Sequence, residues 1–302
     1  MTLDAFFLGN SLISLLMASV QIGLGGIFGD SDDTADTSAE FDADPLFDES
    51  QYTQRIDGTA GNDVLNATEG ENAQAYFLGD GDDTLRATAG NDYINLGAGD
   101  DFTEALEGDD IVLGGDGDDR IFAGRGDDVV FGGAGNDLLE GSLGADTLNG
   151  GDGNDQLSGG RENDTLNGGA GDDILSGDRF DQISGTQRGV DILNGDAGND
   201  TLWLVGDDTG TGGAGEDLFR VFDTENPDAS VTITDYNSAE DRIEVIYEPE
   251  DGEEPPELTV FSPADSEDAV IALDGVQIAT VTGAAGLESD DISLTTDMPN
   301  AA

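Results

Sequence analysis

Large apolar residues recur at every ninth position through the middle of this chain. The residues beside each of them favour an extended backbone, whereas the six residues before it are rich in glycine and can turn tightly. Each nine-residue unit therefore predicts one turn and one short strand, and two units predict a full coil with a thin apolar core. The apolar positions are Leu85, Ile94, Val112, Ile121, Val130, Leu139, Leu148, Leu157, Leu166, Leu175, Leu193 and Leu202, with Thr103 as a polar exception.

An aspartate precedes each of these positions by two residues and holds the same phase. A glycine stands two residues before nearly every aspartate, and Glu162 replaces it once in the unbroken run. Copies out of frame flank the run at residues 61–65 and 212–219, which predicts short insertions beside the main array. Low-complexity tracts do not hold a phase, so the pattern favours a folded array over disorder. The aspartates are Asp83, Asp92, Asp101, Asp110, Asp119, Asp128, Asp137, Asp146, Asp155, Asp164, Asp173, Asp191 and Asp200.

Both ends of the chain depart from this period. Residues 1–30 form an apolar segment in which residues 5–29 carry no charge, and we expect a helix there that is long enough to span a bilayer. A membrane anchor and a buried helix both stay open, while a cleaved signal peptide fits poorly because no Lys or Arg precedes the segment. Residues 31–54 are predicted to be an acidic linker.

From about residue 221 onward we expect a β cap over the open end of the array, residues 221–302, which also holds the secretion region. Asp274–Gly275 predicts a two-residue hairpin between the last two strands. The expected strands are residues 231–236, 242–247, 258–261, 269–273 and 276–281.

Charge narrows the partners. The chain has 68 acidic residues against 9 basic ones, a net charge of −59, which excludes nucleic acid and anionic membrane surfaces as electrostatic partners and favours cations. Residues eighteen apart stack in the expected coil, so Asp119 lies over Asp137 and Asp137 over Asp155, and bare carboxylates would repel. A cation between the coils removes this repulsion. The chain has no Cys or His, so only hard oxygen ligands are present, and these favour Ca²⁺ over Mg²⁺, zinc, copper or iron.

The unit resembles G-G-x-G-x-D-x-U-x, the repeat of RTX (hemolysin-type) calcium-binding proteins. Its fullest copies are residues 114–122, 132–140, 150–158 and 168–176. The resemblance implies an all-β fold, a right-handed parallel β-roll over residues 55–220 with several Ca²⁺ ions between its coils. It assigns side-chain ligands to the thirteen aspartates named above. It assigns backbone ligands to the glycine positions Gly114, Gly117, Gly132, Gly135, Gly150, Gly153, Gly168 and Gly171.

One stretch departs from the repeat. Gln182 stands where the ligand aspartate is expected and Phe180 where the glycine is expected, so residues 177–185 predict a defective turn or a protruding loop. Glu162 is expected to weaken the site of Asp164, whose partner eighteen residues later is the same Gln182.

The family resemblance also implies export through type I secretion machinery, with folding outside the cell where calcium is plentiful. Residues 232–236 and 240–243 resemble the segment that closes such arrays. The predicted location is extracellular, and a membrane anchor at the cell surface through residues 5–29 is the alternative.

Catalysis is not expected. Without His and Lys the chain offers no H-E-x-x-H motif, no Ser–His–Asp set and no Schiff base, and only a paired-carboxylate glycosidase stays open. We expect an exported calcium-binding protein with a structural or surface role. A membrane-tethered calcium buffer or sensor and a carbohydrate-binding adhesin are the alternatives.

Overall fold

The computed structural model describes residues 47–67, 70, 72–178, 189–222, 229–247 and 255–296. The chain divides into two compact units, residues 1–44 and 45–302, and every described residue belongs to the second. The expected N-terminal helix and the linker before residue 47 lie outside the described residues. Within the described part there is no α-helix, and no helix there has the length and apolarity to cross a membrane.

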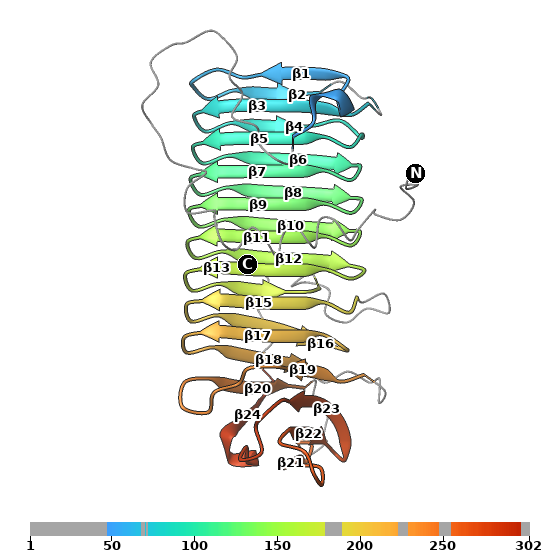
Figure 1. Cartoon of the computed structure of the whole chain (residues 1–302), viewed down its shortest axis with the longest axis vertical. Helices are drawn as coiled ribbons and strands as arrows, with labels where there is room; N and C mark the ends of the chain where they lie inside the picture. Colours follow the sequence, from blue (N-terminus) through green and yellow to red (C-terminus); the bar gives the residue numbers. More distant parts are fainter. Residues whose placement is uncertain are drawn as a thin grey trace, which may run out of the picture. The chain divides into compact units, whose positions relative to one another are not determined.

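Two mainly parallel sheets build the second unit, and consecutive strands alternate between them (Figure 1). The first sheet contains, in order, β1 (Gln54–Asp57), β3 (Gln74–Asp80), β5 (Tyr93–Ala98), β7 (Ile111–Asp116), β9 (Val129–Ala134), β11 (Thr147–Asp152), β13 (Thr165–Ala170), β15 (Ile192–Ala197), β17 (Thr209–Ala214), β19 (Val231–Ile233), β23 (Val276–Val281), β22 (Ala269–Leu273) and β21 (Leu258–Phe261). The second contains β2 (Val64–Asn66), β4 (Thr84–Arg86), β6 (Phe102–Glu107), β8 (Arg120–Arg125), β10 (Leu138–Leu143), β12 (Gln156–Arg161), β14 (Ile174–Ser176), β16 (Thr201–Val205), β18 (Leu218–Phe222), β20 (Arg242–Ile246) and β24 (Ile292–Thr295). The expected parallel β-solenoid is confirmed.

The coil length is eighteen residues through most of the array, so that Leu139 of β10 pairs with Leu157 of β12. It changes at three places. The first step is 20 residues, from Gln54 to Gln74, in agreement with the expected insertion. The step from Thr165 to Ile192 is 27 residues, and the following step from Ile192 to Thr209 is 17. The expected insertion before residues 212–219 is therefore wrong, because the chain there is one residue shorter than a regular coil.

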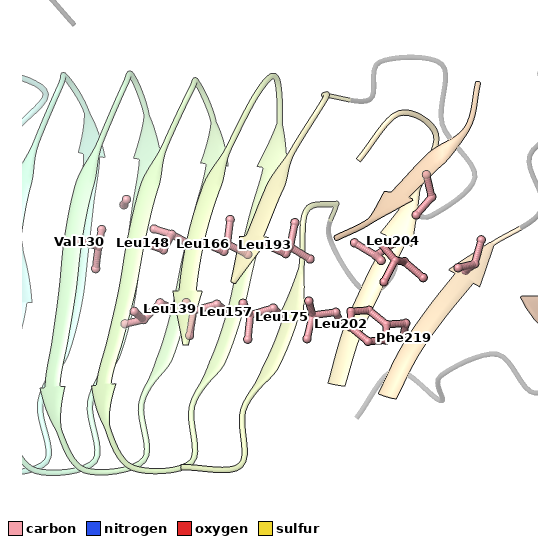
Figure 2. Packing of buried hydrophobic residues seen from close by; sticks show 14 of the residues in the cluster. Val130, Leu139, Leu148, Leu157, Leu166, Leu175, Leu193, Leu202, Leu204 and Phe219 are labelled. Carbon is pink, nitrogen blue, oxygen red and sulfur yellow. The ribbon is translucent and has the colours of Figure 1, made fainter. Parts of the chain in front are cut away.

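The apolar residue of each unit points between the two sheets, as predicted. Figure 2 shows Val130, Leu148, Leu166 and Leu193 in one row, facing Leu139, Leu157, Leu175 and Leu202 in the other, and all eight are fully buried. A buried Leu contributes about 1.5–3 kcal/mol, whereas ordering the backbone of nine residues costs roughly 9–18 kcal/mol. Backbone hydrogen bonds and the turns must therefore supply the remaining stabilisation.

An aromatic cluster covers the outer face of the first sheet at its beginning. The Phe47 ring stacks on Tyr52 at 5.5 Å and meets Phe77 at 5.1 Å and Tyr93 at 4.8 Å between ring centroids. The short 3₁₀ helix η2 (Glu49–Gln51) lies between the first two of these residues. We refer to Phe47, Tyr52, Phe77 and Tyr93 as the aromatic cluster.

The far end of the array carries the expected cap. Strand β23 pairs parallel with β19 and antiparallel with β22, and β24 pairs parallel with β20, so both sheets are extended past the last coil. The Asp274–Gly275 turn has positive φ at both residues (49° and 82°), which is the hairpin geometry that the dipeptide predicts. Strand β24, which follows the 3₁₀ helix η3 (Ser289–Asp291), was not predicted.

Candidate functional site

The aspartate at the sixth place of each unit lies in a turn between the two sheets, and its side chain is buried. Asp119 and Asp137 are 1% and 2% exposed. One carboxylate oxygen, Oδ1, accepts the backbone N–H of the aspartate one coil earlier, so that Asp119 N–H donates to Asp137 and Asp137 N–H to Asp155, both at 2.8 Å. These bonds run through the array as two aspartate ladders, one at each edge of the coils.

Ladder 1 consists of Asp63, Asp83, Asp101, Asp119, Asp137, Asp155, Asp173, Asp200, Asp217 and Asp241. Ladder 2 consists of Asp92, Asp110, Asp128, Asp146, Asp164, Asp191 and Asp208. All thirteen aspartates that the sequence singled out belong to one ladder or the other. The sequence missed four members, Asp63, Asp208, Asp217 and Asp241, although the out-of-frame copies contain the first and third of them.

The second carboxylate oxygen, Oδ2, is buried without a hydrogen-bond partner in twelve ladder members, as far as the described residues show. An unpaired buried polar atom costs about 1–3 kcal/mol, and more when it is charged. A row of such atoms is typical of a site that a bound ion completes. The twelve are Asp83, Asp101, Asp110, Asp119, Asp128, Asp137, Asp146, Asp155, Asp164, Asp173, Asp200 and Asp217.

Glycine at the first place of the unit holds this oxygen beside the next coil. A Cβ added to Gly132 would overlap Oδ2 of Asp137 and lie 2.6 Å from the carbonyl oxygen of Gly150. The carboxylate oxygen and a carbonyl oxygen of the following coil therefore converge on a space that only glycine leaves free. Gly114, Gly150 and Gly168 repeat this arrangement with Asp119, Asp155 and Asp173.

Glycine at the fourth place has a different role. Gly135 has φ of +137°, and a Cβ there would overlap the carbonyl oxygen of Gly117 one coil earlier. Gly117, Gly153 and Gly171 share this positive φ and close stacking. The eight predicted glycines thus fall into two groups, four beside the Oδ2 atoms and four where the backbones of successive coils touch.

Burial and like charge disfavour the ionised form of these carboxyls. Burial raises the pKa of Asp110 to about 9, against the lowering effect of the Asp92 N–H bond, and the neighbouring charges of Asp128 and Asp92 raise it further. The same causes raise the pKa of Asp119 to about 8 and that of Asp137 to about 7. The ladders therefore require a proton or a cation near neutral pH.

The ligands that the turns offer are mostly backbone atoms. In the described part of the chain, no group of three or more acidic side chains converges to hold a metal. Each corner instead combines one carboxylate with carbonyl oxygens of adjacent coils, and hard oxygens in a pliable loop suit Ca²⁺.

A second, exposed set of hydrogen bonds links the residues at the fifth place and was not foreseen. Asp118 N–H donates to Asp100 at 3.0 Å and Asn136 N–H to Asp118 at 2.8 Å, in the direction opposite to the ladders. Each turn is therefore tied to both neighbouring coils, and Asp or Asn at the fifth place has a structural purpose.

The irregular stretch corrects one prediction. Asp164 N–H donates to Asp191 at 2.9 Å, so its ladder partner is Asp191 and not Gln182. Residues 179–188, which include most of the predicted defective turn, lie outside the described residues. Ladder 1 crosses the same step, since Asp173 N–H donates to Asp200 at 2.8 Å. Glu162 replaces the fourth-place glycine and adopts φ of 78°, so the fold imposes the left-handed conformation even on a glutamate.

Comparison with known proteins agrees with this geometry. The model of the RTX calcium-binding nonapeptide repeat (four copies) matches residues 51–72, 77–112, 104–139, 113–148, 149–181 and 186–219, which is more than half of the chain. No curated protein matches the chain.

Two solved structures share a more distant likeness. An R-module of the Azotobacter vinelandii mannuronan C5-epimerase is 25% identical with a TM-score of 0.33, over 48% of this chain and 83% of that one. The extracellular lipase LipA from Serratia marcescens is 18% identical with a TM-score of 0.22, over 64% of this chain and 41% of that one. With TM-scores this low, neither likeness extends to function. The repeat match and the two aspartate ladders together show that the chain belongs to the RTX calcium-binding nonapeptide-repeat family.

Proposed function

We propose that this chain is an exported calcium-binding protein whose array folds when it binds Ca²⁺, with a structural or surface role and no catalysis of its own. The observation that carries the proposal is the row of twelve buried Oδ2 atoms without partners. Calcium would give these oxygens a ligand and neutralise the like charge along each ladder.

The ligands would be the ladder carboxylates together with carbonyl oxygens of the turns, such as Asp137 with the Gly150 carbonyl beside it. Family membership supports this choice of metal, because the matching repeat is a calcium-binding one. The coils would be right-handed, as parallel crossover connections almost always are.

Secretion is part of the proposal. Proteins with RTX repeats are typically secreted, and an array that is stable only with calcium stays unfolded where calcium is scarce. Type I secretion machinery is the proposed partner for export. The absence of His, Cys and Lys supports a binding role over catalysis.

Equilibrium dialysis of the full chain against Ca²⁺, paired with circular dichroism, tests the proposal. We expect several ions per chain and a gain of β-sheet signal on calcium addition, with little response to an equal concentration of Mg²⁺. Absence of calcium uptake by the wild-type chain, or equal folding with Mg²⁺, would overturn the assignment.

A further inference from the structure

The first and last members of both ladders differ from the rest in what their Oδ2 atoms contact. Oδ2 of Asp63, which begins ladder 1, accepts the backbone N–H of Thr59 at 2.6 Å and the Thr59 hydroxyl at 3.0 Å. Oδ2 of Asp92, which begins ladder 2, accepts the backbone N–H of Thr88 at 3.0 Å and its hydroxyl at 2.8 Å. Each carboxylate is therefore bound by its own turn.

The ladders end in the same way. Oδ2 of Asp208, the last member of ladder 2, accepts the backbone N–H of Val205 at 2.8 Å. Oδ2 of Asp241, the last member of ladder 1, accepts the backbone N–H of Asn237 at 2.7 Å. We call these four the closed corners, and the twelve with an unpartnered Oδ2 the open corners.

The sequence explains the two closed corners at the beginning. Both read T-A-G-N-D, at residues 59–63 and 88–92, with threonine where the repeat has its second glycine. Neither Gly61 nor Gly90 has positive φ, whereas the fourth-place glycines of the open corners have φ between 120° and 150°. The threonine turn thus aims its N–H and hydroxyl at the carboxylate instead of leaving it open.

We propose that calcium occupies open corners only, and that the closed corners are metal-free stops which hold the two ends of each ladder. The inference rests on the proposed calcium function and specifies where that function stops. A carboxylate oxygen that already accepts one or two charge-assisted bonds must lose them before it can ligate an ion, whereas an open corner loses nothing.

Two neighbours in ladder 2 make a matched test. Asp92 and Asp110 are each 1% exposed, and Asp92 N–H donates to Asp110, but only Asp110 has an unpartnered Oδ2. Asn retains one oxygen acceptor in either place. In equilibrium dialysis of the full chain at saturating Ca²⁺, we expect Asp110→Asn to bind about one ion fewer than the wild type and Asp92→Asn to bind the same number.

A Thr88→Gly variant examines the same corner in the opposite direction, because it removes the hydroxyl and restores the repeat. We expect about one additional ion per chain. Loss of an ion in Asp92→Asn equal to that in Asp110→Asn would overturn the inference, and so would an unchanged count in Thr88→Gly.

A measurement on the wild type removes any dependence on how the variants fold. Crystals of the full chain grown with Tb³⁺, which replaces Ca²⁺ at oxygen sites, should show anomalous density at open corners and none within bonding distance of Asp63, Asp92, Asp208 or Asp241. Density at any of these four would overturn this inference alone. A wild-type chain that binds no calcium would instead overturn the proposed function.

Discussion

Removal of calcium is expected to unfold the array near neutral pH, and acid is expected to restore part of it. The cause is the same in both cases, because the ladder carboxyls are buried side by side and their ionised form is disfavoured. Either a cation or a proton relieves this, and the free energy involved can be worked out from two of the groups.

Asp110 and Asp164 set the scale. Burial, with smaller contributions from neighbouring carboxylates, raises the pKa of each to about 9 from the ordinary value of 3.8. One pKa unit corresponds to about 1.4 kcal/mol, so at about pH 7.5 each group destabilises the metal-free fold by roughly 5 kcal/mol relative to the unfolded chain. Two such groups offset most of the 5–15 kcal/mol, roughly, that keeps a typical domain folded.

The direction with pH follows from the raised pKa. A carboxyl whose folded pKa exceeds its unfolded value contributes stability that is complete below about pH 4 and is lost as the pH rises through about 9. Lowering the pH from about 8 to about 5 therefore relieves each of these two groups by roughly 4 kcal/mol. Calcium affinity changes in the opposite sense, because the ion requires the deprotonated oxygen.

The assay is β-sheet circular dichroism in EGTA across this pH range, together with the fluorescence of Trp203, which is 5% exposed. Sedimentation velocity serves as the control for association, since protonation reduces a net charge of −59 that otherwise keeps copies apart. A full β-sheet signal with a cooperative melt in EGTA at about pH 8 would refute the reasoning. A signal that stays flat down to about pH 5 would refute it as well.

Three substitutions separate the roles of corner, turn and core. Asp137→Asn should weaken calcium binding at its corner about tenfold or more, whereas Asp235→Asn, whose oxygens bind two backbone N–H groups of the β17 turn, should leave calorimetric affinity nearly unchanged; equal effects would contradict the ladder assignment. Gly135→Val, at φ of +137°, should lower urea stability in saturating calcium by about 3 kcal/mol, and Gly286→Val, with nothing within 4 Å, is its control; equal midpoints would argue against close stacking. Leu157→Ala should cost about 2–5 kcal/mol in the same assay while the number of bound ions stays constant, and loss of an ion would show that core and corner are not separate.

Features that depend on the nine-residue unit alone could be predicted from the sequence. The buried row through Leu139 and Leu157 and the ladder through Asp119 and Asp137 both follow from the phase of the repeat. Asp208 escaped because its unit lacks the apolar residue, with Gly210 in that place. Leu204 fills the space instead, since its Cδ1 lies 2.7 Å from where a Cβ of Gly210 would be.

Features that depend on which coils become neighbours could not be predicted. The partner of Asp164 is decided by a step of 27 residues, and counting in units of eighteen leads to Gln182 instead. The closure of Asp92 is equally hidden, because its place in the unit is the same as that of Asp110. The difference lies in Thr88, whose effect on the turn emerges only from the hydrogen bonds it makes.

Regular coils carry a risk of slippage during folding. Leu157 packs between Leu139 and Leu175, and a chain that skips one whole coil would meet nearly the same contacts, either with itself or with another copy. The uneven steps of 20, 27 and 17 residues and the aromatic cluster occur once each and have no equivalent elsewhere in the described array. They act as registration marks that make one alignment better than its shifted copies. A redesigned chain with every coil identical would still load metal, but it would settle into a mixture of misaligned lengths.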